Sequence, residues 1–257
     1  PEDGLLIARW DDPNVRAVAE DAACTIWKYG PGMEWSGEIL SVNHETGTMR
    51  FRVQRDDETV LEAETSLVGD HNLWNQVAAV AALVREGLDP QLIAQGFSSF
   101  QGIRRRQEVR GTPGEVAVVD DFAHHPTAVS VTLDALRLKF GGRRIWAVFE
   151  PRSNTSRRNI FQAEYAAAFA TADRVIIAAT SDCSGIAEEE RMDFNALASD
   201  LRAQGQEAIT LDRSDEIVAT LSANVMEGDV VALLSNGAFD GIHEKLLSAL
   251  ESRFERT

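Results

Sequence analysis

The feature that most constrains the fold is an alternation of short apolar runs with segments of helical periodicity, which fills the chain from Ile103 onward. Strands and helices that alternate in this way are joined by right-handed crossovers and form a mostly parallel sheet with helices on both faces. We therefore predict an α/β fold for this part of the chain. The expected strands are Gln107–Arg110, Glu115–Val119, Arg144–Phe149, Arg174–Ala179, Glu207–Thr210 and Val230–Leu234. The expected helices are Thr127–Phe140, Ser156–Thr171, Asp193–Gln204, Ser214–Ala223 and Asp240–Glu251.

The first hundred residues show a different pattern. Polar and apolar residues alternate with a period of two, which is typical of an antiparallel meander with one exposed face. The segments concerned are Ser36–Val42, Thr48–Gln54 and Thr59–Ser66, preceded by an expected strand at Leu5–Ala8 and helix at Pro13–Ala22, and followed by helices that begin after an N-cap at Asp70 and at Asp89-Pro90. Helical periodicity stops at Ser98–Gly102, so we place a domain boundary there, between domains 1–101 and 102–257.

Charge and cysteine content exclude several classes of protein. The formal net charge of −16 over 257 residues argues against nucleic acid as a partner, because binding it over a broad surface needs a basic face. No apolar run is long enough to cross a bilayer, so membrane insertion is not expected. Cys24 and Cys183 are far apart and form neither a disulfide framework nor a zinc motif, which favours a reducing cytoplasm.

Four polar loops follow expected strands of the second domain. Because the carboxyl ends of parallel strands meet at one edge of a sheet, where doubly wound proteins bind their ligands, we expect these loops to gather there. They are Asp120–Pro126, Glu150–Asn159, Thr180–Gly185 and Ser235–Gly241.

The Asp120–Pro126 loop places two carboxylates and two imidazoles in one turn. A carboxylate at the end of a strand can accept hydrogen bonds from ribose hydroxyls, and a neighbouring imidazole can contact phosphate, so nucleotide binding is favoured. Adjacent histidines do not converge on one metal, and no third ligand has suitable spacing, which argues against zinc. No Gly-x-Ser-x-Gly elbow is present, which argues against a serine hydrolase.

Two arginine clusters stand out in this acidic chain. Arg152, Arg157 and Arg158 suit a carboxylate or phosphate, because a guanidinium holds either group with two parallel hydrogen bonds. The alternative is a solvated loop paired with surface acids. Arg104–Arg106, at the domain boundary, can likewise contact phosphate or only solvate the joint.

Two asparagines begin the helix after Gly69. The amides of Asn72 and Asn75 can recognise an adenine edge or another polar ligand. The alternative, equally weighted, is that they only cap and solvate the first turn.

Taken together, five stretches resemble the ATP-dependent Mur ligases of peptidoglycan synthesis. They are Gly69–Asn75, Arg104–Arg106, Asp120–Thr127, Glu150–Thr155 and Ser235–His243. The last two resemble the branch that joins UDP-N-acetylmuramate to the tripeptide L-Ala-γ-D-Glu-meso-diaminopimelate in cell-wall recycling. The resemblance covers essentially the whole chain.

The resemblance implies a three-domain enzyme, of which residues 1–101 would be the second half of the central ATPase domain and residues 102–257 the C-terminal Rossmann-like domain. The phosphate loop of the family, of Gly-x-x-Gly-Lys-Thr type, is absent, as is the UDP-sugar domain. We therefore expect an N-terminally truncated fragment that is inactive alone, with most Mg²⁺ ligands outside it.

The resemblance also implies roles for individual residues. The expected ATP contacts are Asn72 and Asn75 near adenine, Arg105 or Arg106 at the phosphates, Asp121 at the ribose and His124 on the phosphate side, together with His71. The expected contacts with the carboxylates of the incoming peptide are Arg152, Ser153, Asn154, Ser235 and Asn236. The muramoyl carboxylate would be activated as an acyl phosphate and attacked by the amine of the tripeptide. No general base is identified.

Two alternatives are open. Within the family, UDP-N-acetylmuramate–L-alanine ligase carries a similar Asp-Asp-aromatic-small-His-His-Pro turn. Outside it, the chain would be a non-catalytic module that binds nucleotide or peptide.

Overall fold

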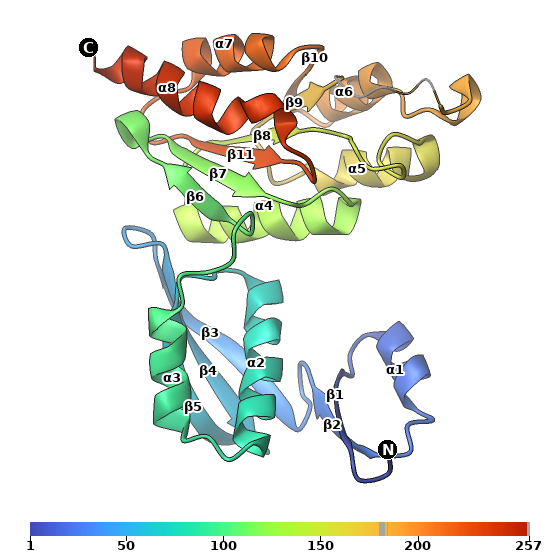
Figure 1. Ribbon diagram of the computed structural model, residues 1–257, viewed down its shortest axis with the longest axis vertical. Helices are drawn as coiled ribbons and strands as arrows, with labels where there is room; N and C mark the ends of the chain where they lie inside the picture. The colour runs from blue at the N-terminus through green and yellow to red at the C-terminus, as the bar shows by residue number, and fades with distance from the viewer. Residues whose placement is uncertain (180–182, 184, 256–257) are drawn as a thin grey trace. The chain divides into compact units, whose positions relative to one another are not determined.

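The computed structural model describes residues 1–179, 183 and 185–255. The chain separates into two compact units, Pro1–Gly102 and Ile103–Thr257, called unit 1 and unit 2 below (Figure 1). Each unit is described by itself.

Unit 1 is built on a five-stranded sheet in the order β1-β2-β3-β4-β5. β1 and β2 are parallel, as are β2 and β3, whereas β3, β4 and β5 form an antiparallel meander. The elements are β1 Leu5–Arg9, α1 Pro13–Ala19, β2 Thr25–Tyr29, β3 Trp35–Asn43, β4 Thr48–Arg55, β5 Glu58–Thr65, α2 Asp70–Arg85 and α3 Pro90–Ser99.

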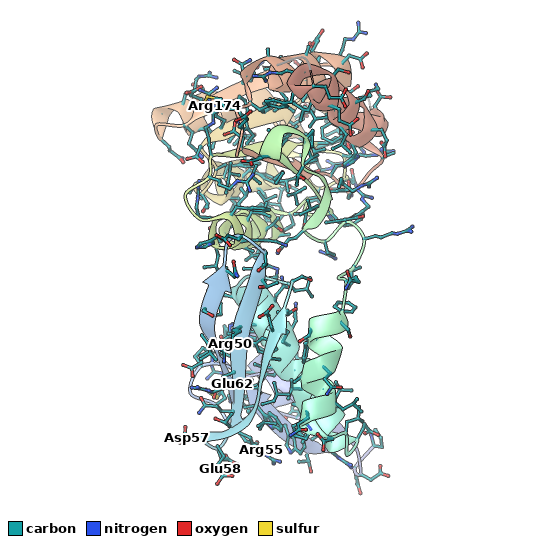
Figure 2. All side chains as sticks on the ribbon, turned by 90° about the vertical axis from the view of Figure 1, so that its left-hand side faces the viewer. Arg50, Arg55, Asp57, Glu58, Glu62 and Arg174 are labelled. Atoms are coloured by element: carbon teal, nitrogen blue, oxygen red, sulfur yellow. The ribbon has the colours of Figure 1, made fainter. Side chains whose placement is uncertain are left out.

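The two-residue alternation of the meander separates a core face from an exposed face, as predicted. Met49, Phe51 and Val53 of β4 are fully buried, and Phe51 packs edge-on against Phe97 of α3. The residues between them point the other way and form an ion-pair ladder, in which Arg50 contacts Glu62 at 2.9 Å (Figure 2). Such exposed pairs add little stability, and the buried face holds the unit together.

Three expectations for unit 1 are wrong in detail. Strand β2 was not expected, because Thr25–Tyr29 lacks a clear two-residue alternation. α1 ends at Ala19 rather than Ala22. The N-cap of α2 is Gly69, whose φ of 117° suits glycine, and Asp70 is instead the first helical residue, where its charge favours the helix dipole.

Unit 2 is a three-layer α/β domain, which confirms the predicted fold class. Its six-stranded sheet has the order β10-β9-β8-β11-β7-β6, and all neighbouring strands are parallel except β6 with β7. The elements are β6 Glu108–Gly111, η1 Pro113–Glu115, β7 Ala117–Asp121, α4 Pro126–Phe140, β8 Ile145–Phe149, η2 Asn159–Phe161, α5 Gln162–Ala168, β9 Arg174–Ala178, η3 Glu188–Glu190, α6 Phe194–Ala203, β10 Glu207–Leu211, α7 Ser214–Asn224, β11 Val230–Leu234, η4 Phe239–Gly241 and α8 Ile242–Phe254.

The central strands of unit 2 are buried on both faces, so each face has its own core (Figure 1). One core joins the sheet to α4, α5 and α6, through residues such as Leu133, Phe169 and Leu201. The other joins it to α7 and α8, through residues such as Leu221 and Leu246. Continuous apolar strands of this kind are the mark of a parallel sheet covered on both sides.

Several boundaries in unit 2 differ from expectation, two of them for a reason in the local structure. β7 begins at Ala117, after a 3-10 turn, and continues through Asp120 and Asp121, which pair with Leu233 and Leu234 of β11. The helix expected from Ser156 begins only at Gln162, because the Ser153 hydroxyl accepts a hydrogen bond from the Ser156 N–H and closes a separate turn.

Candidate functional site

Three of the four polar loops start side by side at the carboxyl edge of the sheet of unit 2. Leu234, the last residue of β11, is in register with Asp121 of β7 on one side and Phe149 of β8 on the other. The loops that begin at Phe122, Glu150 and Ser235 therefore share one edge, as expected for a ligand site. In the fourth loop, residues 180–182 and 184 lie outside the described part of the chain.

Asp121 lies beneath this edge rather than on it, with 2% of the residue exposed. Its Oδ2 accepts from the Gln107 N–H at 2.8 Å, and its Oδ1 accepts from the Ala123 N–H at 2.8 Å and the Thr132 hydroxyl at 3.3 Å. Burial raises the pKa of Asp121, against the lowering effect of these backbone donors. The carboxylate thus holds the turn, and its contact with ribose stays a prediction.

His124 is half-buried and fixed by its neighbours. Its Nδ1 lies 2.9 Å from the Phe122 carbonyl oxygen, and the Tyr165 hydroxyl donates to the His124 carbonyl at 2.6 Å. His125 is exposed and packs edge-on against Phe161. The two imidazoles therefore have different surroundings, and the phosphate contact of His124 stays a prediction.

Asp120 forms a cluster of charged groups that the sequence did not single out. The residue is 2% exposed, and its carboxylate lies 3.2 Å from His243 Nε2, 3.5 Å from Arg105 Nε and 3.2 Å from Arg110 Nη1. Burial would raise the pKa of Asp120, but the nearby imidazole of His243 and the charge of Arg105 outweigh it and hold that pKa below its usual value. The partners lie 10 to 123 positions away, so no local motif reveals them.

The two arginines expected near phosphate differ in exposure and in their hydrogen bonds. Arg105 Nη2 donates to the carbonyl oxygens of Ser235 at 2.5 Å and Gly237 at 2.8 Å. Arg106 is exposed, and its guanidinium lies 6.0 Å from the Phe122 ring. Within unit 2, Arg106 is therefore the better placed of the two to meet a ligand.

The residues expected to face peptide carboxylates lie in the loops after β8 and β11. Arg152 and Asn154 are exposed, whereas Ser153 uses its hydroxyl in the turn with Ser156. Arg152 lies against Gly237, where an added Cβ would be 2.3 Å from Arg152 Nη1. The two loops therefore touch.

Ser235 is buried, and its hydroxyl links the same two loops. The hydroxyl accepts from the Gly237 N–H at 2.9 Å and donates to Glu150. Asn236 is half-buried. Glu150 itself, with 7% of the residue exposed, is the first residue after β8, and the sequence predicted no role for it. Whether these side chains bind peptide remains a prediction.

A hollow of about 270 Å³ opens beside Glu150 at this edge. Its carboxylates outnumber its cations, even though Lys245 Nζ contacts Asp240 at 2.8 Å and Asp215 at 2.9 Å. The lining residues are Glu150, Asp212, Arg213, Ser214, Asp215, Phe239 and Asp240. Such a lining suits a ligand with an ammonium group.

The remaining predicted residues lie in unit 1, at the start of α2. Asn72 Nδ2 donates to the Val68 carbonyl at 3.0 Å, which is a local contact but not a helix cap, because a cap accepts from a backbone N–H. Asn75 is exposed and His71 half-buried. The adenine contacts of Asn72 and Asn75 and the ATP contact of His71 stay predictions.

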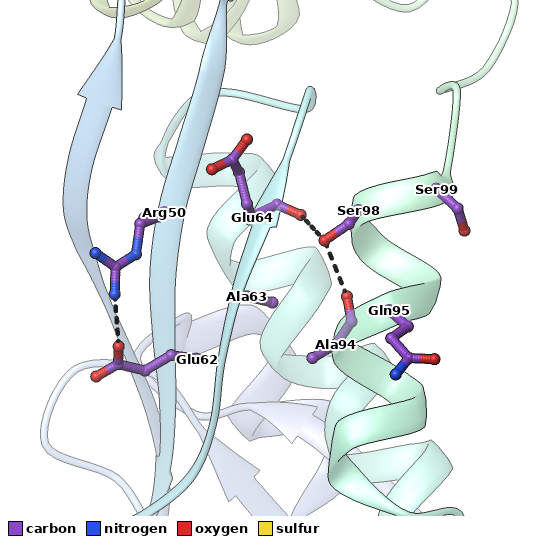
Figure 3. Close-up of a pocket in the computed structure, with 8 residues that line it drawn as sticks. All are labelled: Arg50, Glu62, Ala63, Glu64, Ala94, Gln95, Ser98 and Ser99. Atoms are coloured by element: carbon purple, nitrogen blue, oxygen red, sulfur yellow. Dashed lines mark hydrogen bonds and ion pairs between the residues drawn. The ribbon is translucent and has the colours of Figure 1, made fainter.

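Unit 1 also has a hollow of about 510 Å³ between β5 and α3, bordered by Ala63, Ala94 and the charged pair Arg50 and Glu62 (Figure 3). Ser98 spans it, donating to the Glu64 carbonyl at 3.4 Å. None of the predicted site residues lines this hollow.

Among the described residues, no group of three or more His, Cys, Asp or Glu side chains is arranged to hold a metal ion. Within the same part of the chain, every helix is too short or too polar to cross a membrane.

Unit 2 is thus a doubly wound α/β domain whose charged loops meet at the carboxyl edge of its sheet, the edge where folds of this class bind ligands. Residues 105–237, just over half of the chain, match the family described as Mur ligase, glutamate ligase domain. The chain belongs to the Mur ligase family.

Known relatives extend the match to nearly the whole chain. The chain is 38% identical over 260 residues to the UDP-N-acetylmuramate–L-alanyl-γ-D-glutamyl-meso-2,6-diaminoheptandioate ligase of Escherichia coli, covering 99% of the chain and 53% of that protein. It is 34% identical over 252 residues to the UDP-N-acetylmuramate–L-alanine ligase of Acetivibrio thermocellus, covering 96% and 52%.

Among solved structures, a murein peptide ligase from Psychrobacter arcticus superposes with a TM-score of 0.63 at 28% identity, covering 98% of this chain and 52% of that one. The chain spans about half the length of the curated relatives it matches.

Proposed function

We propose that the chain is part of an ATP-dependent ligase that forms an amide bond between UDP-N-acetylmuramate and an amine-bearing substrate in peptidoglycan metabolism. Membership of the Mur ligase family supports this proposal, as do the names of the two relatives above. ATP supplies the phosphoryl group that activates the carboxylate. The proposed domain assignment is the latter part of the central ATPase domain for residues 1–101 and the C-terminal domain for residues 102–257.

We further propose that the amine substrate is the tripeptide L-Ala-γ-D-Glu-meso-diaminopimelate. The observation that carries this is the sheet edge of unit 2, where exposed Arg152 lies against Gly237 and a carboxylate-lined hollow opens at Glu150. A tripeptide has several carboxylates that can pair with Arg152 and a second amine that can pair with the carboxylates of the hollow. A single alanine has too few charged groups to contact both. The 38% identity to the tripeptide ligase points the same way.

The second candidate is the L-alanine ligase, and the 34% identity to the Acetivibrio thermocellus protein favours it. In that case Arg152 would hold the single carboxylate of alanine, and the hollow beside Glu150 would have no role in binding.

For ATP, we propose contacts from His71, Asn72, Asn75, Arg106 and His124. Asp121 lies beneath the turn that bears His124 and holds that turn in place. Arg106 fits a phosphate because it is exposed and lies beside the loop that bears His124. The described residues hold no acid cluster suited to Mg²⁺, so no metal ligand is proposed among them.

The test is ADP release by the complete protein that contains this chain, with UDP-N-acetylmuramate and either amine substrate. We expect kcat/KM for the tripeptide to exceed that for L-alanine by about 100-fold or more, because charged groups left unpaired in a site cost several kcal/mol. Preference for L-alanine would transfer the proposal to the second candidate. Residues 1–257 alone should release no ADP, and turnover by them would contradict the assignment as part of a larger enzyme.

A further inference from the structure

We propose that Arg105 is a positioning residue that clamps the loop 235–237, with Asp120 orienting its guanidinium. That this loop serves the amine substrate rests on the proposed function above. The clamp itself does not.

The guanidinium of Arg105 joins two segments 130 positions apart. Its Nη2 donates to the Ser235 and Gly237 carbonyl oxygens, and its Nε faces the Asp120 carboxylate at 3.5 Å. Hydrogen bonds from a charged donor are stronger than neutral ones, and two of them on alternate residues fix the path of a short loop.

The backbone of Arg105 is also held in place. Its φ of 58° lies in the left-handed region, which is strained for a residue with a long side chain. The Arg105 N–H donates to Glu108 Oε2 at 2.8 Å, and its carbonyl accepts from the Phe122 N–H at 2.9 Å. Strain of this kind persists only where surrounding contacts over-determine it, as they do here.

Asp120 sets the direction of the clamp. It is buried and held from two further sides, by His243 of α8 and Arg110 of β6, so its position does not depend on Arg105. With the carboxylate fixed, the guanidinium plane of Arg105 turns toward the loop rather than toward solvent.

The clamped loop in turn positions Arg152 and Glu150, the two groups proposed to face the amine substrate. The side chain of Arg152 packs against Gly237, and the Ser235 hydroxyl donates a hydrogen bond to the Glu150 carboxylate. Arg105 therefore acts on the amine substrate through these residues, and of the two arginines only Arg106 contacts phosphate.

Arg110 provides a matched control. It also contacts Asp120, at 3.2 Å, but its other partner is exposed Glu244 rather than the loop. Replacing either arginine removes one cation from Asp120, and only Arg105 is bonded to the loop.

The first experiment is amide hydrogen exchange of residues 1–257. In Arg105→Ala, exchange in peptides covering 235–239 should rise about tenfold or more, because both charged hydrogen bonds are lost. In Arg110→Ala the same peptides should change less than about twofold. Equal exchange in the two variants, or no rise in Arg105→Ala, would overturn the proposal. If Arg105→Ala does not fold, Arg105→Lys is compared with Arg110→Ala by the same criterion, because an ammonium cannot reproduce the fork of donors.

The second experiment is steady-state kinetics of the complete ligase. Arg105→Lys should raise KM for the amine substrate about tenfold while leaving KM for ATP within about twofold. A rise in KM for ATP alone would make Arg105 a phosphate ligand and overturn its role as a clamp. If the wild-type protein shows no ligation, the proposed function fails, and the exchange experiment still decides on the clamp.

Discussion

At the scale of single residues, the hydrogen bonds of Asp121 make its carboxylate part of the structure of the turn. Asp121→Ala leaves the buried N–H groups of Gln107 and Ala123 without acceptors. We expect a loss of about 2–4 kcal/mol in the free energy of unfolding, measured by urea denaturation of residues 1–257. Thr132→Val removes only the hydroxyl donor and should cost about 1 kcal/mol. Equal stability of wild type and Asp121→Ala would contradict this account.

Asp120 predicts a pH dependence of stability. Because its pKa is lowered in the folded protein, the ionised group stabilises the fold above the unfolded value, about 3.9, and that contribution is lost as the pH falls through the folded value. Wild type should therefore be more stable than Asp120→Asn at pH 7, and the difference should shrink below about pH 4. Urea midpoints at pH 7, 5 and 3.5 measure it. A difference that stays constant or grows in acid would show that the carboxylate is not stabilised by its partners.

The sequence predicted which residues gather at the sheet edge, but not which of them form hydrogen bonds and ion pairs within the protein. Polar residues at the ends of expected strands were enough to place Asp121, Arg152 and Ser235 near the same edge of the sheet. The internal partners could not be predicted, because Arg105 bonds to Ser235 across 130 positions and Asp120 meets His243 across 123. Contacts at such separations depend on topology rather than on local spacing.

At the scale of elements, periodicity predicted the strands of the meander and of unit 2, and it failed where local hydrogen bonds override it. The hydrogen bond between Ser153 and Ser156 forms a separate turn, so the helix begins at Gln162 and not at Ser156. The short strand Thr25–Tyr29 lacks a periodic pattern. The spacing of apolar residues indicates which face of an element is buried. It therefore does not predict elements whose ends are set by local hydrogen bonds.

A pair of glycines tests the packing of these elements. A Cβ at Gly37 of β3 would lie 2.6 Å from Val77 Cγ2 of α2, so Gly37→Ala should cost about 1–3 kcal/mol by overpacking. Gly96 of α3 has open space around the same position, and Gly96→Ala should stabilise by about 0.5–1 kcal/mol through helix propensity. Thermal unfolding of both variants measures the contrast. Loss of stability in Gly96→Ala, or none in Gly37→Ala, would contradict the packing described.

At the scale of the whole molecule, each unit has its own buried core. We expect residues 103–257 to fold alone, because both faces of their sheet are covered by their own helices. Circular dichroism and a cooperative urea transition of the isolated segment measure this. A segment that is unfolded or unfolds without cooperativity would show that its cores need unit 1.

The most direct test of the central claim, that the loops after β8 and β11 bind the amine substrate, is the kinetics of Arg152→Ala in the complete ligase. Arg152 is exposed and lies against Gly237, whereas Arg158, in the same loop, is paired with Glu190 and provides the control. Arg152→Ala should raise KM for the tripeptide about tenfold to 100-fold with KM for ATP unchanged, and Arg158→Ala should change either constant less than about threefold. Unchanged tripeptide kinetics in Arg152→Ala, or equal effects of the two substitutions, would contradict the account.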